Sequence, residues 1–119
     1  MKTSGTLHSL LRDQASEISG QLRLLANPER LIMLCRLAEG EASVGTLGDL
    51  TGLSQSSVSQ HLAMLRAAKK VEVRRVAQNR YYLLVDEKLR AIINALCAVC
   101  DLHPEAGEAN GSRAIVRTM

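Results

Sequence analysis

Three cysteines, Cys35, Cys97 and Cys100, are the residues of this chain best suited to covalent or metal chemistry. A thiolate is a strong nucleophile and a ligand for soft metal ions, so three thiolates together could hold As(III) or Cu(I). A free cysteine is also often buried and packs as a small hydrophobic residue. The cysteines alone therefore leave sensing, metal binding and simple packing open.

The pair Cys97-x-x-Cys100 also has the spacing found in thiol oxidoreductases. Those enzymes place the pair at the N-terminal end of a helix, where the helix dipole stabilises the thiolate. Here the pair closes an apolar helical repeat, and no strand–helix–strand pattern surrounds it. No Ser/His/Asp set, glycine-rich phosphate loop or paired carboxylates offer another catalytic site. We therefore expect a protein that is not an enzyme and needs no cofactor.

Basic side chains are concentrated in one stretch of the chain, although the net charge is only +3. The members of this stretch are Arg66, Lys69, Lys70, Arg74, Arg75, Arg80, Lys88 and Arg90. A local excess of this kind is typical of a surface that binds nucleic acid.

Composition and the N-terminal residues indicate the cellular setting. Hydrophobic residues make up 46% of the chain, as in a soluble globular domain, and no apolar run is long enough to span a bilayer. Arg12 and Asp13 interrupt the N-terminal apolar positions, so no signal peptide is predicted. We expect a cytoplasmic protein without membrane contact, whose cysteines are mainly reduced.

Apolar residues at helical spacing predict a series of helices before and within the basic stretch. These helices span residues 6–25, 28–39, 46–52 and 54–68. Asn27, Thr46 and Ser54 are expected to cap the last three of them, and Gly20 is a possible break in the first. The last two helices, joined by a short turn, form a helix-turn-helix pattern.

Beyond this pattern, the segments VEVRRV and YYLLV flank the polar turn AQNR and predict a β-hairpin. Helical spacing returns over residues 86–102, and Pro104 is expected to end that helix. The fold class is therefore mainly α with a small β-hairpin, a winged helix-turn-helix. One domain is expected over residues 1–104, followed by a loose tail over 105–119.

The sequence also resembles the ArsR/SmtB family of bacterial repressors over about residues 20–100. The segments that carry the resemblance are ANPERLIMLCRLAEGEASVGTL, TGLSQSSVSQHLAMLRAA and a wing ending in RYYLL. One departure is Lys69-Lys70-Val71, where the family usually has a glycine. The resemblance implies a homodimer, formed through the first and last helices, that binds an imperfect inverted repeat of double-stranded DNA and represses transcription.

The predicted DNA-binding residues come from the second helix of the helix-turn-helix and from the hairpin. On the helix, short polar groups lie off the apolar stripe: Ser54, Gln55, Ser56, Ser57, Ser59, Gln60 and His61. Such groups suit a helix in the major groove, where Gln can pair with adenine. On the hairpin, the residues expected to contact phosphate or the minor groove are Arg74, Arg75, Gln78, Asn79 and Arg80. The alternative for both sets is a solvated polar surface.

The family's common metal sites are not matched. The segment VGTLGDLTG lacks Cys and His, and Asp86 and His103 stand without the paired histidines of other members. At about 100° per residue, Cys100 falls in the middle of the last helix's apolar stripe and Cys97 at its edge. A cysteine in the second helix and one closing the last resemble the branch that senses reactive sulfur species and oxidants.

That likeness implies Cys35 and Cys100 as the sensing pair, with a small reactive sulfur species or an oxidant as inducer. The role of Cys97 stays open. A three-thiolate site for As(III) or another soft ion, using Cys35, Cys97 and Cys100, is the alternative.

Overall fold

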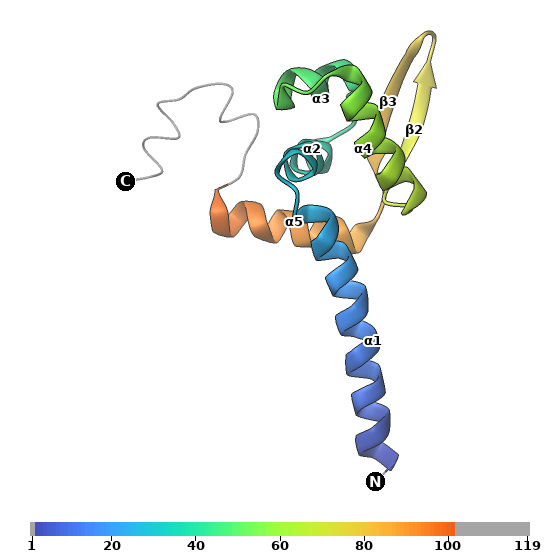
Figure 1. The fold of residues 1–119 in the computed structure, drawn as a ribbon, viewed down its shortest axis with the longest axis vertical. Helices are drawn as coiled ribbons and strands as arrows, with labels where there is room; N and C mark the ends of the chain where they lie inside the picture. Colours follow the sequence, from blue (N-terminus) through green and yellow to red (C-terminus); the bar gives the residue numbers. More distant parts are fainter. Residues whose placement is uncertain (1, 102–119) are drawn as a thin grey trace.

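A small antiparallel sheet lies at one side of a group of helices in the computed structural model, which describes residues 2–101, with side chains from residue 7 (Figure 1). The helices are α1 (Lys2–Leu25), α2 (Pro28–Glu39), α3 (Val44–Thr51), α4 (Gln55–Ala67) and α5 (Glu87–Cys100). The strands are β1 (Ala42–Ser43), β2 (Val71–Val76) and β3 (Asn79–Leu84), in the order β1-β3-β2. The predicted winged helix-turn-helix is confirmed. The expectation that the last helix continues to residue 102 and is ended by Pro104 is wrong, because α5 ends at Cys100 and Asp101 has a left-handed φ of 59°. Pro104, His103 and the tail over 105–119 lie outside the described residues.

Local capping explains where α2 and α4 begin. The Asn27 side chain accepts a hydrogen bond from the Arg30 backbone N–H at 3.0 Å, and Pro28 occupies the first turn of α2. Ser54 Oγ accepts from the Ser57 backbone N–H at 3.1 Å. Both caps satisfy helix N–H groups that have no partner within the helix, and both were predicted.

Two further expectations about the helices are wrong. α1 runs through Gly20 without a break, because one glycine costs a helix only about 1 kcal/mol and does not end it. α3 begins earlier than predicted, since Ser43 and not Thr46 is its N-cap. Ser43 Oγ accepts a hydrogen bond from the Thr46 backbone N–H at 3.1 Å, so Thr46 lies inside the helix.

The turn from α4 into the wing keeps its geometry without the family's glycine. The Lys69 N–H donates to Arg66 O and the Lys70 N–H to Leu65 O, each at 2.9 Å, which is the Schellman pattern. Lys69 has a φ of 63°, in the left-handed region that favours glycine. A lysine there costs about 1–2 kcal/mol, but the turn itself is intact.

An aliphatic core holds the helix-turn-helix against α2 and α5. Its most deeply buried side chains are Met33, Leu34, Leu37, Leu47, Val58, Leu62, Leu65, Val71, Leu89 and Ile93. Because α4 contributes its apolar stripe to this core, its polar side chains are directed to the outside.

One arginine ties α5 to two other elements. The Arg90 guanidinium donates to Ala38 O near the end of α2, at 2.8 Å, and to Leu84 O at the end of β3, at 2.7 Å. Hydrogen bonds from a charged donor are stronger than neutral ones. The first turns of α5 are therefore fixed to both α2 and the base of the wing.

Asp86 caps α5 and pairs with Lys70, so we expect Asp86→Ala to lower the free energy of unfolding by about 1–2 kcal/mol. Burial opposes ionisation of this carboxyl, but hydrogen bonds from Lys70 and from the Leu89 backbone outweigh it and hold its pKa below the usual value. A carboxyl with a lowered pKa stabilises the fold above its unfolded-state pKa of about 3.9, and this stability is lost as pH falls through the folded-state pKa.

Urea denaturation at pH 7 and below about pH 4 checks this, because the difference between wild type and variant should shrink in acid. Asp86→Asn is the control, since asparagine still caps a helix but cannot form the ion pair. An equal difference at both pH values would show that the charge of Asp86 plays no part.

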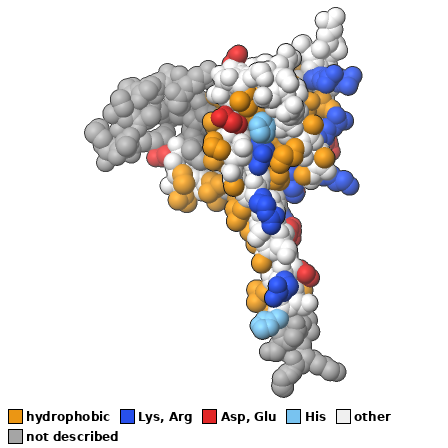
Figure 2. Space-filling view, in the orientation of Figure 1, with side chains coloured by type: hydrophobic (Ala, Val, Ile, Leu, Met, Phe, Trp, Pro, Cys, Tyr) orange, Lys and Arg blue, Asp and Glu red, His pale blue; other side chains and the backbone are white. Residues whose placement is uncertain are grey.

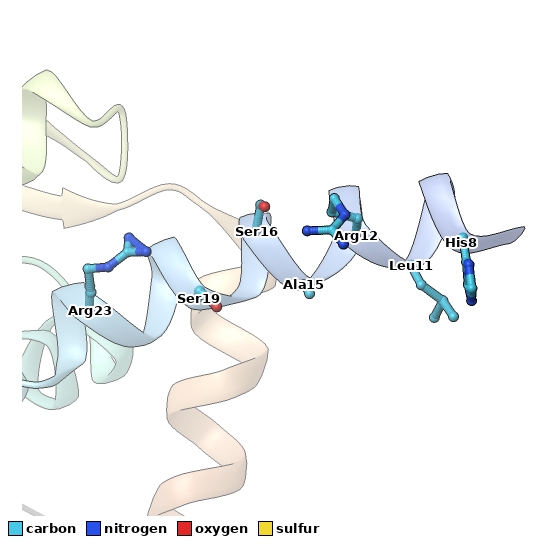
Figure 3. Close-up of a pocket in the computed structure, with 7 residues that line it drawn as sticks. All are labelled: His8, Leu11, Arg12, Ala15, Ser16, Ser19 and Arg23. Atoms are coloured by element: carbon cyan, nitrogen blue, oxygen red, sulfur yellow. The ribbon is translucent and has the colours of Figure 1, made fainter. Parts of the chain in front are cut away.

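α1 projects from the body of the molecule (Figure 1). It exposes an apolar stripe. Leu7, Leu10, Leu11, Ile18 and Leu22 are each 48–55% exposed. Figure 3 shows that Leu11 and Ser16 point to different sides of the helix, beside a shallow groove that His8, Arg12 and Arg23 also line. No helix in the described part of the chain is long and apolar enough to cross a membrane.

Candidate nucleic-acid interface and thiol site

The residues of the helix-turn-helix that are predicted to contact DNA bases lie together on the outer face of α4. Ser54, Gln55, Ser56, Ser59 and Gln60 are exposed, whereas Ser57 and His61 are half-buried. On the opposite side of the helix, Val58, Leu62 and Leu65 are fully buried. The helix therefore offers a rigid row of short donors and acceptors, of the kind that fits the major groove.

A tight turn sets α4 at a fixed angle to α3. Gly52 has a φ of 79°, in the left-handed region where a side chain is strained. At Gly48, an added Cβ would lie 3.5 Å from Leu53 O in the turn and 3.9 Å from the Val58 side chain of α4, so α3 packs in ordinary van der Waals contact with both. The Thr51 hydroxyl donates to Leu47 O at 2.8 Å and accepts from the Leu53 N–H at 3.2 Å.

The register of the wing divides its arginines between two faces. Arg75 stands opposite Arg80, and Arg74 stands opposite Tyr81. Residues directly opposite in an antiparallel pair share a face, and neighbours along a strand alternate. Arg75 and Arg80 therefore lie on the face of the wing that turns toward α4, and Arg74 lies on the other.

A basic hollow lies between α4 and this face of the wing. Ser59, Ala63, Arg66, Ala67, Arg80 and Tyr82 line it. Figure 2 shows Lys and Arg side chains gathered along the edge of the molecule that carries α4 and the wing. Like charges directly opposite each other destabilise a hairpin, and an anion such as a phosphate between Arg75 and Arg80 would offset that repulsion.

Arg66 was not among the predicted DNA-binding residues. It follows Ser59 by seven positions, which is two helical turns, so both side chains share a face of α4. The seven-residue spacing from Ser59 could have identified Arg66 as part of this face from the sequence alone. The sequence could not show that the wing folds back beside this face.

Arg74, in contrast, already pairs with an acidic side chain of the same chain. Its Nε donates to Glu41 Oε1 at 2.9 Å, a second nitrogen also pairs with that carboxylate, and its guanidinium lies 5.6 Å from the centre of the Tyr81 ring. The hydrogen bond from Arg74 holds the pKa of Glu41 below its usual value. The charge of Arg74 is thus balanced on the side of the wing away from α4.

The three thiols lie in different environments. Cys35 is 3% exposed, Cys97 is half-buried, and Cys100 is exposed. Cys35 Sγ lies 3.9 Å from Cys97 Sγ. Burial raises the pKa of Cys35 to about 12, and the neighbouring Cys97 adds to the shift.

The helix angle predicted for Cys100 is correct, but the inward position that it implied is wrong, because Cys100 is exposed and Cys97 is the half-buried thiol next to Cys35. The angle of Cys100 around the helix is close to that of the buried Ile93, but the end of α5 extends past α2 (Figure 1). A side chain there has no neighbouring helix to cover it within the described chain. The Cys97-x-x-Cys100 pair stands at the C-terminal end of α5, as predicted.

Comparison with known proteins settles the family. Residues 27–71 match the model of the arsR family of bacterial regulatory proteins. The chain is also 37% identical over 89 residues to the biofilm growth-associated repressor of Xylella fastidiosa, covering 75% of this chain and 78% of that one. This chain belongs to the arsR family.

Two further relatives agree with this assignment. The arsR-family chain is 38% identical over 105 residues to the nodulation protein NolR of Rhizobium meliloti, covering 88% of this chain and 84% of that one. The structure of reduced HlyU from Vibrio cholerae aligns with a TM-score of 0.71 and 37% identity, over 75% of this chain and 94% of that one. By name, the Xylella protein is a repressor, the Rhizobium protein is a nodulation protein and HlyU of Vibrio cholerae is a transcriptional activator.

Within this arsR-family protein, two of the three arginines of the wing, Arg80 and Arg74, provide a matched pair of variants. We expect Arg80→Ala to weaken binding to every DNA sequence alike and to reduce the slope of log affinity against log salt by about one unit per chain. Arg74→Ala should have a smaller effect, because Glu41 already balances its charge. Fluorescence anisotropy over a salt series measures both, and equal slopes for Arg80→Ala and wild type would remove Arg80 from the interface.

Proposed function

We propose that this arsR-family protein is a homodimeric transcriptional repressor that binds an imperfect inverted repeat of double-stranded DNA. We further propose that its operator affinity falls when thiols around Cys35 are modified by a reactive sulfur species or an oxidant. The observation that carries the DNA part is the common orientation of two surfaces. The polar row of α4 and the basic hollow formed with Arg66 and Arg80 face outward side by side.

The apolar stripe of α1 supports the dimer. Several large aliphatic side chains stand about half exposed on one side of a long helix, and such stripes usually mark a protein interface. A two-fold dimer presents two copies of α4, and these read two half-sites of opposite orientation. In this arrangement α4 supplies base contacts, and the wing supplies contacts to the backbone.

The position of Cys35 supports the thiol switch. Its sulfur is buried where α2 meets α5, and Arg90 ties α5 to α2 and to the wing. A bond from Cys35 to a thiol of α5 would therefore change how α5 packs against α2, and α5 is one of the two helices through which the family resemblance implies that the dimer forms. In the family's thiol-sensing branch the partner corresponds to Cys100, and its exposed position means that this pairing needs the end of α5 to rotate or unwind.

A three-thiolate site for As(III) is the second candidate function. Cys35 and Cys97 already lie close together and could supply two of the ligands. Among the described residues, however, no three His, Cys, Asp or Glu side chains are grouped closely enough to hold a metal ion. This candidate needs Cys100 to move inward, so it has less support than the switch.

Operator binding before and after thiol modification tests the proposal. The reduced protein first selects its site from a random DNA library, and anisotropy then measures affinity after separate treatment with polysulfide, hydrogen peroxide and arsenite. We expect polysulfide or peroxide to weaken binding about 5–150-fold, the range of ordinary allosteric coupling. A variant with all three cysteines changed to serine should bind and not respond. A response to arsenite alone would support the metalloid site, and no response to any reagent would reject the switch but not the DNA-binding function.

A further inference from the structure

The sulfur nearest to Cys35 belongs to Cys97, a residue for which the family resemblance assigns no role. We propose that Cys97, and not Cys100, is the thiol that bonds to Cys35 when this protein is oxidised. The inference rests on the proposed thiol switch and names the pair that performs it. It comes from the packing of α2 against α5 and not from a comparison of cysteine positions along the chain.

The geometry requires little movement. The two sulfurs lie 3.9 Å apart on helices that pack against each other, whereas a disulfide bond is about 2.05 Å long. Side-chain rotation and a small shift of α5 can close the remaining distance of about 2 Å. Cys100 lies almost one helical turn further along α5, about 4.5 Å along the axis, and its side chain is exposed.

Access and burial set the order of events. Cys97 is half-buried, so a small oxidant can reach its sulfur from solvent, while Cys35 is almost completely covered. Burial and the neighbouring Cys97 raise the pKa of Cys35 to about 12, so this thiol is protonated at neutral pH and is a poor first nucleophile. Within this pair, Cys97 is therefore the thiol that reacts first, and Cys35 is the one that resolves the product.

With a hydroperoxide as the oxidant, the Cys97 thiolate attacks one peroxide oxygen. An S–O bond forms, the O–O bond breaks, and the departing oxygen takes a proton and leaves as water or an alcohol. The Cys35 sulfur then attacks the Cys97 sulfur, and the S–O bond breaks. The leaving hydroxide takes the Cys35 proton and departs as water. The two thiols together lose two electrons, which the hydroperoxide gains.

Cys100 serves as the internal control in this scheme. It is three positions from Cys97 on the same helix and is more exposed, so it reacts with added reagents as well. Its sulfur, however, does not lie next to Cys35 in the structure. Oxidation of Cys100 alone should leave α2 and α5 unlinked.

Peptide mapping of the full-length protein locates the bond. The reduced protein is treated with one equivalent of hydrogen peroxide, denatured, alkylated and digested with trypsin without reduction. Cleavage after Arg30 and Arg36 isolates Cys35, but Cys97 and Cys100 remain in one peptide that begins after Arg90. Fragmentation between those two cysteines identifies the linked one in the wild type, so the answer does not depend on whether a variant folds.

We expect the wild type and Cys100→Ser to show a Cys35–Cys97 link, and Cys97→Ser to show none. A Cys35–Cys100 link in the wild type, or a link between two chains, would overturn the assignment while leaving a thiol switch in place. Loss of DNA binding without any link would also overturn it and would point to modification of one thiol. Unchanged DNA binding despite a Cys35–Cys97 link would leave the bond established and reject the proposed switch.

Discussion

Leu11→Asp is expected to separate the dimer and to lower affinity for an inverted-repeat operator by more than about 100-fold, the usual gain from joining two binding sites. Leu11 is 54% exposed in the apolar stripe of α1. If a second copy covers that stripe, the substitution buries an unpaired carboxylate, and the cost is several kcal/mol. Sedimentation equilibrium measures the dimer, and anisotropy measures operator affinity.

Ser16→Asp is the matched control for this experiment. Ser16 is exposed, and Figure 3 shows it on another side of the same helix. The substitution to Asp therefore adds the same charge outside the apolar stripe. We expect this variant to remain a dimer and to bind DNA. A wild-type protein that sediments as a monomer, or a Leu11→Asp variant that stays dimeric, would show that α1 is not the interface.

Gln60→Ala should produce the largest loss of sequence discrimination. Gln60 is exposed on the outer face of α4, and a bidentate contact from glutamine to adenine contributes about 1–3 kcal/mol per half-site. A dimer uses two such contacts, so the expected loss on the operator is about 2–6 kcal/mol. Affinity for random DNA should barely change.

Gln78→Ala is the control of the same residue type. Gln78 lies in the turn of the wing, where contacts to the DNA backbone are expected, so any effect should be similar on operator and random DNA. Competition binding with both kinds of DNA measures the two variants. An equal loss on operator and random DNA for Gln60→Ala would show that Gln60 does not read bases.

Those features of the fold that depend on local chemistry could be predicted from the sequence. Asn27 and Ser54 cap their helices because a short acceptor stands immediately before an apolar repeat. The predicted break at Gly20 was wrong because a glycine is tolerated within a helix. The predicted cap at Thr46 was wrong because Ser43, three residues earlier, takes the same capping role. Boundaries fail where two residues offer similar local signals.

The candidate site was harder to predict because it depends on how far each helix extends and on which elements lie beside each other. The angle of Cys100 around α5 was correct for burial, but the helix extends past α2, and that could not be read from periodicity. In the sequence, Arg74 and Arg80 are both arginines of the predicted hairpin, and nothing there distinguishes their roles. Only the register of the hairpin and the position of Glu41 separate an arginine beside α4 from one that is already paired.

The Arg90 contacts fix the N-terminal part of α5, so Arg90 is the pivot about which this helix can tilt. Cys97 lies seven residues beyond Arg90, an arm of about 10 Å, so drawing its sulfur about 2 Å toward Cys35 would tilt α5 by about 10°. The pivot holds the base of the wing at Leu84, so α4 and the wing should keep their relative positions in each chain. The tilt would instead move the C-terminal part of α5, the last helix, through which the family resemblance implies that the dimer forms. We therefore expect oxidation to change the distance between the two half-sites that the dimer fits, and not the bases that each half reads.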